Sequence, residues 1–194
     1  MNVRLPIITL ALFALTALAN RAWGADNYKI DPEHATVIFS VSHFNLGDAY
    51  GRFNDPTGTV VIDKQDPGKS SFAFEVKTEN VDTDNDKRDT HLKSPDFFNA
   101  KQFPVITFKS TGVKSAGENK YEVTGDLNLH GVTKSITFPI EKTGEGDTKV
   151  MGYRTGWKAA VHLKRSEFGI TYGVQQGAIG DDVHLVISFE AVKS

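Results

Sequence analysis

The chain has 194 residues, enough for one domain, and its 22 lysines and arginines nearly balance 24 aspartates and glutamates, giving a formal net charge of −2 at pH 7. A mildly acidic surface without basic runs argues against a nucleic-acid partner and against electrostatic attachment to an anionic membrane. Cysteine is absent, which excludes disulfides, thiolate metal sites, a thiol nucleophile and an acylated N-terminal cysteine, so the core alone must stabilise the fold.

The first 24 residues have the pattern of a secretory signal peptide. Met1 to Arg4 carries one positive charge, Ile7 to Leu18 is an apolar run, and Ala22-Trp23-Gly24 is a small-x-small cleavage site before Ala25. Because the apolar run is too short to cross a bilayer, we expect a chain that does not span the membrane after cleavage. Residues 25–194 then form the mature domain. A non-cleaved anchor is the alternative.

Alternation of apolar and polar residues with a period of two predicts strands over most of the chain. The apolar members are Val37, Phe39 and Val41; Phe72, Phe74 and Val76; Ile106 and Phe108; Tyr121, Val123, Leu127 and Leu129; Ile136, Phe138 and Ile140; and Val183, Leu185, Ile187 and Phe189. About eight strands with short loops and one helical insert predict an all-β antiparallel barrel or sandwich. Such a barrel is either filled by side chains or holds one small ligand, and the 13 phenylalanines suit both outcomes.

Residues 81–98 break the alternation and predict a short helix with Asp84 or Asn85 as its N-cap. Three residues share one face of such a helix: Arg88, His91 and Leu92. The leucine is expected to point at the core and the other two to lie where the core meets solvent. Phe97 and Phe98 follow in a turn too tight to expose both rings. We interpret the segment as a cap over an apolar interior.

The sequence contains no convincing metal or catalytic motif. Residues 82–86 imitate the start of a calcium-binding loop, but its sixth and twelfth positions are Lys87 and Lys93 instead of Gly and Glu. No G-x-S-x-G elbow occurs. The six histidines are scattered, which is more typical of structural residues than of metal ligands; His43 and His91 are the first suspects for any spatial cluster. We expect no metal, no cofactor and no catalytic residue.

A series of short motifs spans the mature chain. They are YKIDPEH (28–34), FSVSH (39–43), GRF (51–53), RDTHL (88–92), DFF (96–98), FPVITFKS (103–110), GDLNLHGVTK (125–134), RSEFGI (165–170) and GDDV (180–183). Each motif is weak alone, but together and in this order they resemble the YceI-like family of exported polyisoprenoid-binding proteins. Ala35 departs from the serine frequent in that family, and residues 45–50 are particular to this chain.

The resemblance implies an extended, lipocalin-like antiparallel barrel with a helix over one end, in a bacterial periplasm. It also implies that the interior binds a long isoprenoid lipid, such as a polyprenyl phosphate or a quinone. The expected tunnel lining is Phe39, Val41, Phe72, Phe74, Leu92, Phe97, Phe98, Phe108, Leu127, Leu129, Phe138 and Leu185. The expected head-group donors are His43, Arg52, Arg88 and His91, although Arg88 could equally pair with Asp86 or Asp89.

Three hypotheses for function follow from the sequence. The first is an exported carrier of a long apolar lipid, with an isoprenoid lipid or similar amphiphile as its partner and a homodimer as a possible assembly. The second is an enzyme acting on such a lipid through Arg88 and His91, since acid–base catalysis needs tunable groups near the substrate. The third is a structural or stress protein with a solid core.

Overall fold

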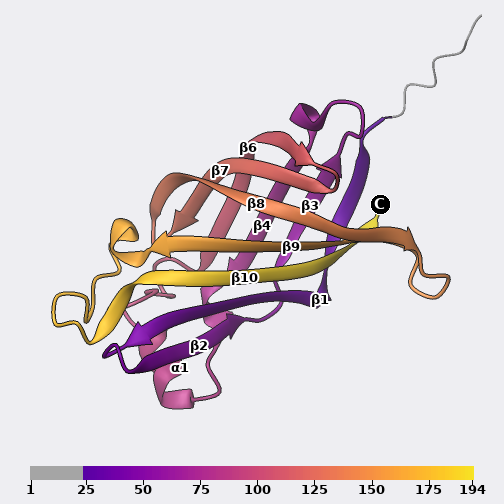
Figure 1. Cartoon of the computed structure of the whole chain (residues 1–194). Coiled ribbons are helices and arrows are strands. Elements are labelled where there is room, and N and C mark those ends of the chain that lie inside the picture. Colours follow the sequence, from indigo (N-terminus) through magenta and orange to yellow (C-terminus); the bar gives the residue numbers. More distant parts are fainter. Residues whose placement is uncertain (1–23) are drawn as a thin grey trace, which may run out of the picture.

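The computed structural model describes residues 24–194, and its main feature is one antiparallel sheet of ten strands (Figure 1). In sheet order they are β10 (Ile179–Lys193), β9 (Tyr153–Lys164), β8 (Val132–Asp147), β7 (Lys120–Leu129), β6 (Val105–Gly117), β4 (Ser71–Lys77), β3 (Thr57–Ile62), β1 (Asp26–His43), β2 (Gly47–Phe53) and β5 (Val81–Asp82). β10 also pairs with β1, so eight strands close into a barrel. The predicted all-β antiparallel barrel is confirmed. The predicted signal peptide lies, except for Gly24, outside the described residues.

β1 is long enough to have a different neighbour in each half. Its first residues pair with β3 and its last residues with β2, while β10 accompanies both halves. A register shift between β1 and β10, from Ile30 to Ala35, separates the halves. β2 in turn pairs with the short β5. The barrel end that carries the β1–β2 hairpin is therefore walled by β2 and the nearby helix α1 (Asp86–Leu92) instead of β3 (Figure 1).

The opposite half of the barrel is filled by large side chains. Trp157 and Phe72 are almost completely buried, and their rings meet edge to face with centres 5.2 Å apart. Phe189 stacks on the same indole, and Val60 and Val123 are fully buried around it. Burial of each such side chain contributes roughly 1.5–3 kcal/mol, so this half is the stable part of the core. Short 3-10 turns, η1 (Pro67–Lys69) and η2 (Thr78–Asn80), follow β3 and β4.

The helical insert forms as the sequence predicts. Asn85 is the N-cap of α1, and its side-chain oxygen accepts the backbone N–H of Arg88 at 3.0 Å. Leu92 packs against both parts of the hydrophobic core. After the helix the chain turns back on it, because Phe98 donates its N–H to the Leu92 carbonyl at 2.9 Å. Phe97 is buried by this turn and Phe98 half-buried. The insert is thus a packed cap rather than a free loop.

Near the filled end, Asp31 provides a pH-dependent contribution to stability. Arg154 Nη1 donates to Asp31 Oδ2 at 2.5 Å and His34 Nδ1 lies 2.9 Å from the same oxygen. These hydrogen bonds lower the Asp31 pKa from 3.8 to about 2. A carboxyl whose pKa is lower in the folded state stabilises the fold above its unfolded-state pKa. We expect wild type to be more stable than Asp31→Asn at pH 7, with the gap closing as the pH falls from about 4 to about 2.

Denaturant unfolding of both proteins at neutral and acidic pH measures this gap. Asp126→Asn, which changes an exposed carboxylate on β7, is the control and is expected to show no such convergence. A gap for Asp31→Asn that stays constant down to pH 2 would show that the ion pair is not the cause.

Candidate functional site

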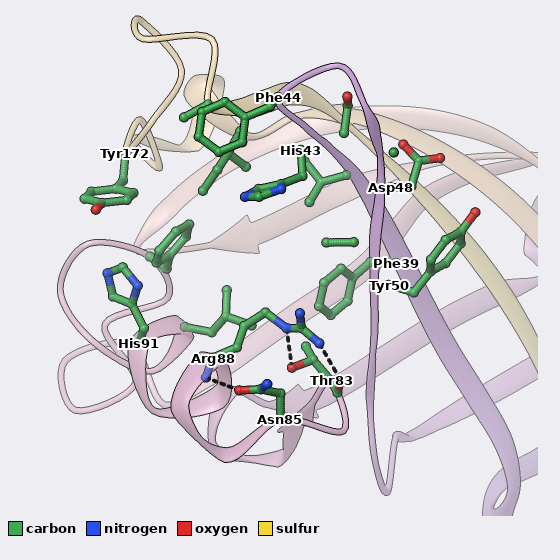
Figure 2. A pocket seen from close by; sticks show the side chains of 18 of the residues that line it. Phe39, His43, Phe44, Asp48, Tyr50, Thr83, Asn85, Arg88, His91 and Tyr172 are labelled. Carbon is green, nitrogen blue, oxygen red and sulfur yellow. Dashed lines mark hydrogen bonds between the residues drawn. The ribbon is translucent and has the colours of Figure 1, made fainter.

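A cavity of about 910 Å³ opens at the barrel end that carries α1 (Figure 2). We call it the mouth cavity. Its walls come from the β1–β2 hairpin, from α1 and from the segment between η3 (Arg165–Phe168) and β10. Its lining residues are Phe39, Val41, Ser42, His43, Phe44, Leu46, Gly47, Asp48, Ala49, Tyr50, Thr83, Asn85, Lys87, Arg88, His91, Leu92, Phe97, Tyr172, Ala178 and Ile179. The mouth cavity therefore combines polar and apolar groups.

Two smaller cavities continue from the mouth cavity into the barrel. They have volumes of about 150 and 100 Å³, and their linings are almost entirely apolar. The inward residues of β10 mark the path. Ile179 borders the mouth cavity and the second cavity. From Val183 onward the lining residues follow in steps of two, as strand geometry requires: Val183 borders the second cavity, Leu185 the second and third, and Ile187 the third. Phe189 then lies in the filled half. The barrel is hollow toward α1 and solid beyond.

Most residues predicted to line a tunnel border these cavities. They are Phe39, Val41, Phe74, Leu92, Phe97, Phe98, Phe108, Leu127, Leu129, Phe138 and Leu185. Phe72 lies elsewhere, against Trp157 in the filled half. Other lining residues were missed although their alternation was visible in the sequence, among them Val37, Val183 and Leu163. Ile170 and Tyr172 belong to an irregular segment that carries no periodic signal. Contact of any of these residues with a ligand stays a prediction.

Arg88 borders the mouth cavity and holds α1 to Thr83, the residue that follows β5 (Figure 2). Its Nε donates to Thr83 Oγ1 and its Nη2 to the Thr83 carbonyl, both at 2.7 Å. Asp89 accepts the Thr83 N–H and hydroxyl at 2.9 and 2.5 Å. Among the described residues Arg88 makes no ion pair with Asp86 or Asp89, so its partner is Thr83. Its Nη1 makes no hydrogen bond within residues 24–194 and remains a donor for the cavity.

His43 and His91 both border the mouth cavity. His91 Nε2 lies 2.9 Å from Asp96 Oδ2, and its ring meets those of Phe97 and Tyr172 edge to face. The His43 ring packs on Phe44, with centres 4.6 Å apart. Asp96 thus fixes the orientation of His91.

Arg52 does not line the mouth cavity. Its Nε and Nη2 donate to Asp82 Oδ2 at 3.1 and 2.8 Å. Asp84 donates its backbone N–H to the same carboxylate, and together with Arg52 and Asn54 it lowers the Asp82 pKa to about 2. Arg52 therefore joins β2 to β5.

Within residues 24–194, one group of three side chains has the spacing of a metal site: Asp31, Glu33 and His34. It lies on the first half of β1, and none of the three residues borders the mouth cavity. Asp31 already accepts hydrogen bonds from Arg154 and His34, so the group fits an ion-pair cluster.

Comparison with known proteins identifies the family. A family model described as a YceI-like domain matches residues 28–191. The chain belongs to the YceI-like family. It is 40% identical to a UPF0312 protein of Azotobacter vinelandii over 190 residues, which cover 95% of this chain and 97% of that protein. A UPF0312 protein of Pseudomonas aeruginosa is 38% identical over 189 residues, with 96% and 97% covered.

Solved structures share the fold of this YceI-like barrel. The Campylobacter jejuni YceI protein matches with a TM-score of 0.70 at 27% identity, covering 79% of this chain and 89% of that one. Burkholderia cenocepacia BcnA matches with a TM-score of 0.75 at 21% identity, covering 83% and 98%. A Saccharophagus degradans domain has a TM-score of 0.66 at 16% identity, covering 86% and 98%. Within residues 24–194, no helix is long and apolar enough to cross a membrane.

Arg165, which opens the RSEFGI motif but receives no role from the sequence, stabilises one wall of the YceI-like site. It is buried and borders the second cavity. Its guanidinium donates to four backbone carbonyls at 2.7–3.1 Å, those of Ile170, Tyr172, Ile179 and Gly180. Burial lowers its pKa. Ile170 and Tyr172 lie in the segment between η3 and β10, and Ile179 and Gly180 are the first two residues of β10. One side chain therefore ties that segment to the start of β10 and fixes the shape of the wall.

Gly51 on β2 lets Phe39 and Thr83 approach each other beneath the cap. A Cβ at this position would lie 2.7 Å from Thr83 Cγ2 and closer still to the Phe39 ring. We expect Gly51→Ala to lower the free energy of unfolding by about 1–3 kcal/mol, as overpacking does. Denaturant unfolding measures the change. Gly47→Ala on the same strand, where a Cβ meets nothing within 4 Å, is the control. Equal stability of the two variants would contradict this packing.

Proposed function

We propose that this protein is an exported binding protein, or carrier, for a long apolar lipid of the isoprenoid type. The observation that carries the proposal is the row of three adjoining cavities, open at one end and apolar inside. An isoprenoid tail has no hydrogen-bonding groups, so it requires such a dry interior. Each buried CH₂ contributes roughly 0.8 kcal/mol, which for a long tail exceeds the cost of ordering it. The S. degradans domain with this fold is described as polyisoprenoid binding, which is consistent with the proposal.

The polar groups of the mouth cavity suit the head of such a lipid. Arg88 Nη1 and Lys87 are donors at the opening, where a phosphate or a quinone carbonyl would lie, and His43 and His91 border the same opening. A charge-assisted bond from a guanidinium is stronger than a neutral one. The tail would then extend past Leu92 and Phe97 toward Leu185. Export rests on the pattern of residues 1–24 and implies a periplasmic protein.

The cavities favour binding over catalysis, because the lining of the two inner cavities is apolar and suits a tail. Arg88 is hydrogen-bonded to Thr83 and His91 to Asp96. A histidine oriented by a carboxylate is also the arrangement that acid–base catalysis uses, so turnover of a prenyl phosphate or quinone that is lost in His91→Ala would support the enzyme alternative.

A chain-length series tests the proposal. Isoprenoid alcohols or quinones of increasing length are offered in detergent micelles, and their affinities for the purified protein are measured. We expect affinity to rise with each added isoprene unit until the cavities are filled, and then to level off. Affinity that is weak and independent of length would contradict a tail-binding interior.

A further inference from the structure

Four exposed apolar side chains border the mouth cavity, and we call them the mouth rim: Phe44, Leu46, Tyr50 and Tyr172. Figure 2 shows Phe44, Tyr50 and Tyr172 around the opening. Leu46, at the tip of the β1–β2 hairpin, is 90% exposed, and the other three are about half exposed. Among the described residues only four other large apolar side chains are similarly exposed. Ile38 and Val186 lie on adjacent strands, and Val150 and Met151 in the β8–β9 turn. Exposed apolar residues gathered at one place mark an interaction site.

The mouth rim is held in place by its backbone. Phe44 and Asn45 both have left-handed dihedral angles, with φ of 52° and 53°, and Leu46 donates its N–H to the His43 carbonyl at 3.0 Å. Such a tight hairpin turn is ordinarily made by glycine or asparagine, so the bulky Phe44 at this position destabilises the turn. Phe44 also donates its N–H to Ala178 at 2.9 Å, which joins the hairpin to the segment that carries Tyr172. The hairpin tip and its apolar side chains are therefore displayed in a fixed arrangement.

Charges of both signs line the opening, since Lys87 and Arg88 are positive and Asp48 is negative. Residues 25–194, the expected mature chain, carry 20 lysines and arginines against 24 aspartates and glutamates, because Arg4 and Arg21 precede them, so their net charge of −4 is also small. An opening that carries both signs can contact zwitterionic phospholipid head groups, because each head group also carries one positive and one negative charge. It gives no electrostatic attraction to an anionic surface.

We propose that the mouth rim inserts into the surface of a zwitterionic phospholipid bilayer. The proposal rests on the proposed function, because a long apolar lipid can then pass between the membrane and the cavities without crossing water. The physical basis is that of interfacial binding through buried apolar area. The mouth rim lies around the entrance through which the lipid must pass.

The absence of cysteine allows a local test. Leu46→Cys and Val150→Cys each provide one attachment site for a polarity-sensitive fluorophore. Val150 is 90% exposed, as Leu46 is, but lies in the turn between β8 and β9 at the other end of the barrel (Figure 1). With phosphatidylcholine vesicles we expect a blue shift of the label at residue 46 and none at residue 150, at low and high salt alike. The two variants differ only in the position of the label, so the difference between them reports on the mouth rim.

Partitioning of unlabelled variants gives a second measurement. Leu46→Asp is expected to weaken vesicle binding roughly tenfold relative to Val150→Asp, since insertion of one leucine is lost. Equal shifts at residues 46 and 150, or none at 46, would overturn the proposal. So would a shift at 46 that grows with protein concentration without vesicles, because a second copy would then cover the mouth rim. Binding of a long quinone by wild type in micelles tests the proposed function separately: if it persists while the vesicle tests fail, only the docking proposal is wrong.

Discussion

Leu185→Trp is expected to abolish binding of long isoprenoids while leaving the barrel folded. Leu185 is half-buried although it points inward, because it borders the second and third cavities. An indole at this position would occupy the space between them and leave no passage for a tail. The tail then loses its contacts in the inner cavities. Each CH₂ group of the tail that is no longer buried costs roughly 0.8 kcal/mol of binding free energy, and several of them together correspond to at least a hundredfold weaker affinity. Titration with a long quinone in micelles measures it.

The neighbouring residue supplies the control. Val186 is 56% exposed on the outer face of the same strand, so Val186→Trp adds the same side chain outside the barrel. We expect it to bind the quinone as wild type does. The melting temperature of Leu185→Trp should stay near that of wild type, since the indole fills existing space. Undiminished quinone binding by a folded Leu185→Trp would show that the tail lies elsewhere.

Arg165→Met is expected to cost the largest amount of stability of any single change considered. The substitution keeps the apolar part of the side chain but leaves four backbone carbonyls of the cavity wall without their donor. Buried groups that lose a charged partner cost on the order of 1–3 kcal/mol each, partly recovered where water enters. We therefore expect a loss of about 3 kcal/mol or more in the free energy of unfolding, measured with denaturant, and faster hydrogen exchange in residues 169–180.

Two companion variants sharpen this result. Arg165→Lys keeps the charge but lacks the planar fork that reaches several acceptors, so an intermediate loss is expected. Lys164→Met removes the adjacent, exposed partner of Asp182, and surface pairs of this kind contribute little. If Arg165→Met were no less stable than Lys164→Met, the cavity wall would be held by other contacts.

The sequence was sufficient for the barrel because its strands are amphipathic, and period-two alternation records which side chains point inward. It was also sufficient for α1, since Asn85 and the face containing Leu92 follow local rules. Alternation could not separate the hollow half from the filled half. Phe72 and Phe74 share one face of β4, yet the first packs on Trp157 and the second borders a cavity. That difference depends on which residues lie across the barrel.

The polar residues were harder to place, because their roles depend on partners distant in the chain. Arg52 was expected to contact a head group, but it pairs with Asp82, thirty residues away. Arg165 donates to carbonyls that lie 5 to 15 residues further along the chain. No local sequence pattern predicts such contacts. The sequence gives no reason to select Leu46. Its exposure and its position beside the mouth cavity are properties of the folded chain.

Native mass spectrometry of the protein, purified from its own cells without detergent, tests the lipid-binding account most directly. We predict a mass that exceeds the polypeptide by that of one long apolar lipid. The extra mass should be released by organic extraction and be missing from Leu185→Trp. A protein at the bare polypeptide mass, both as purified and after incubation with long isoprenoids, would contradict the account.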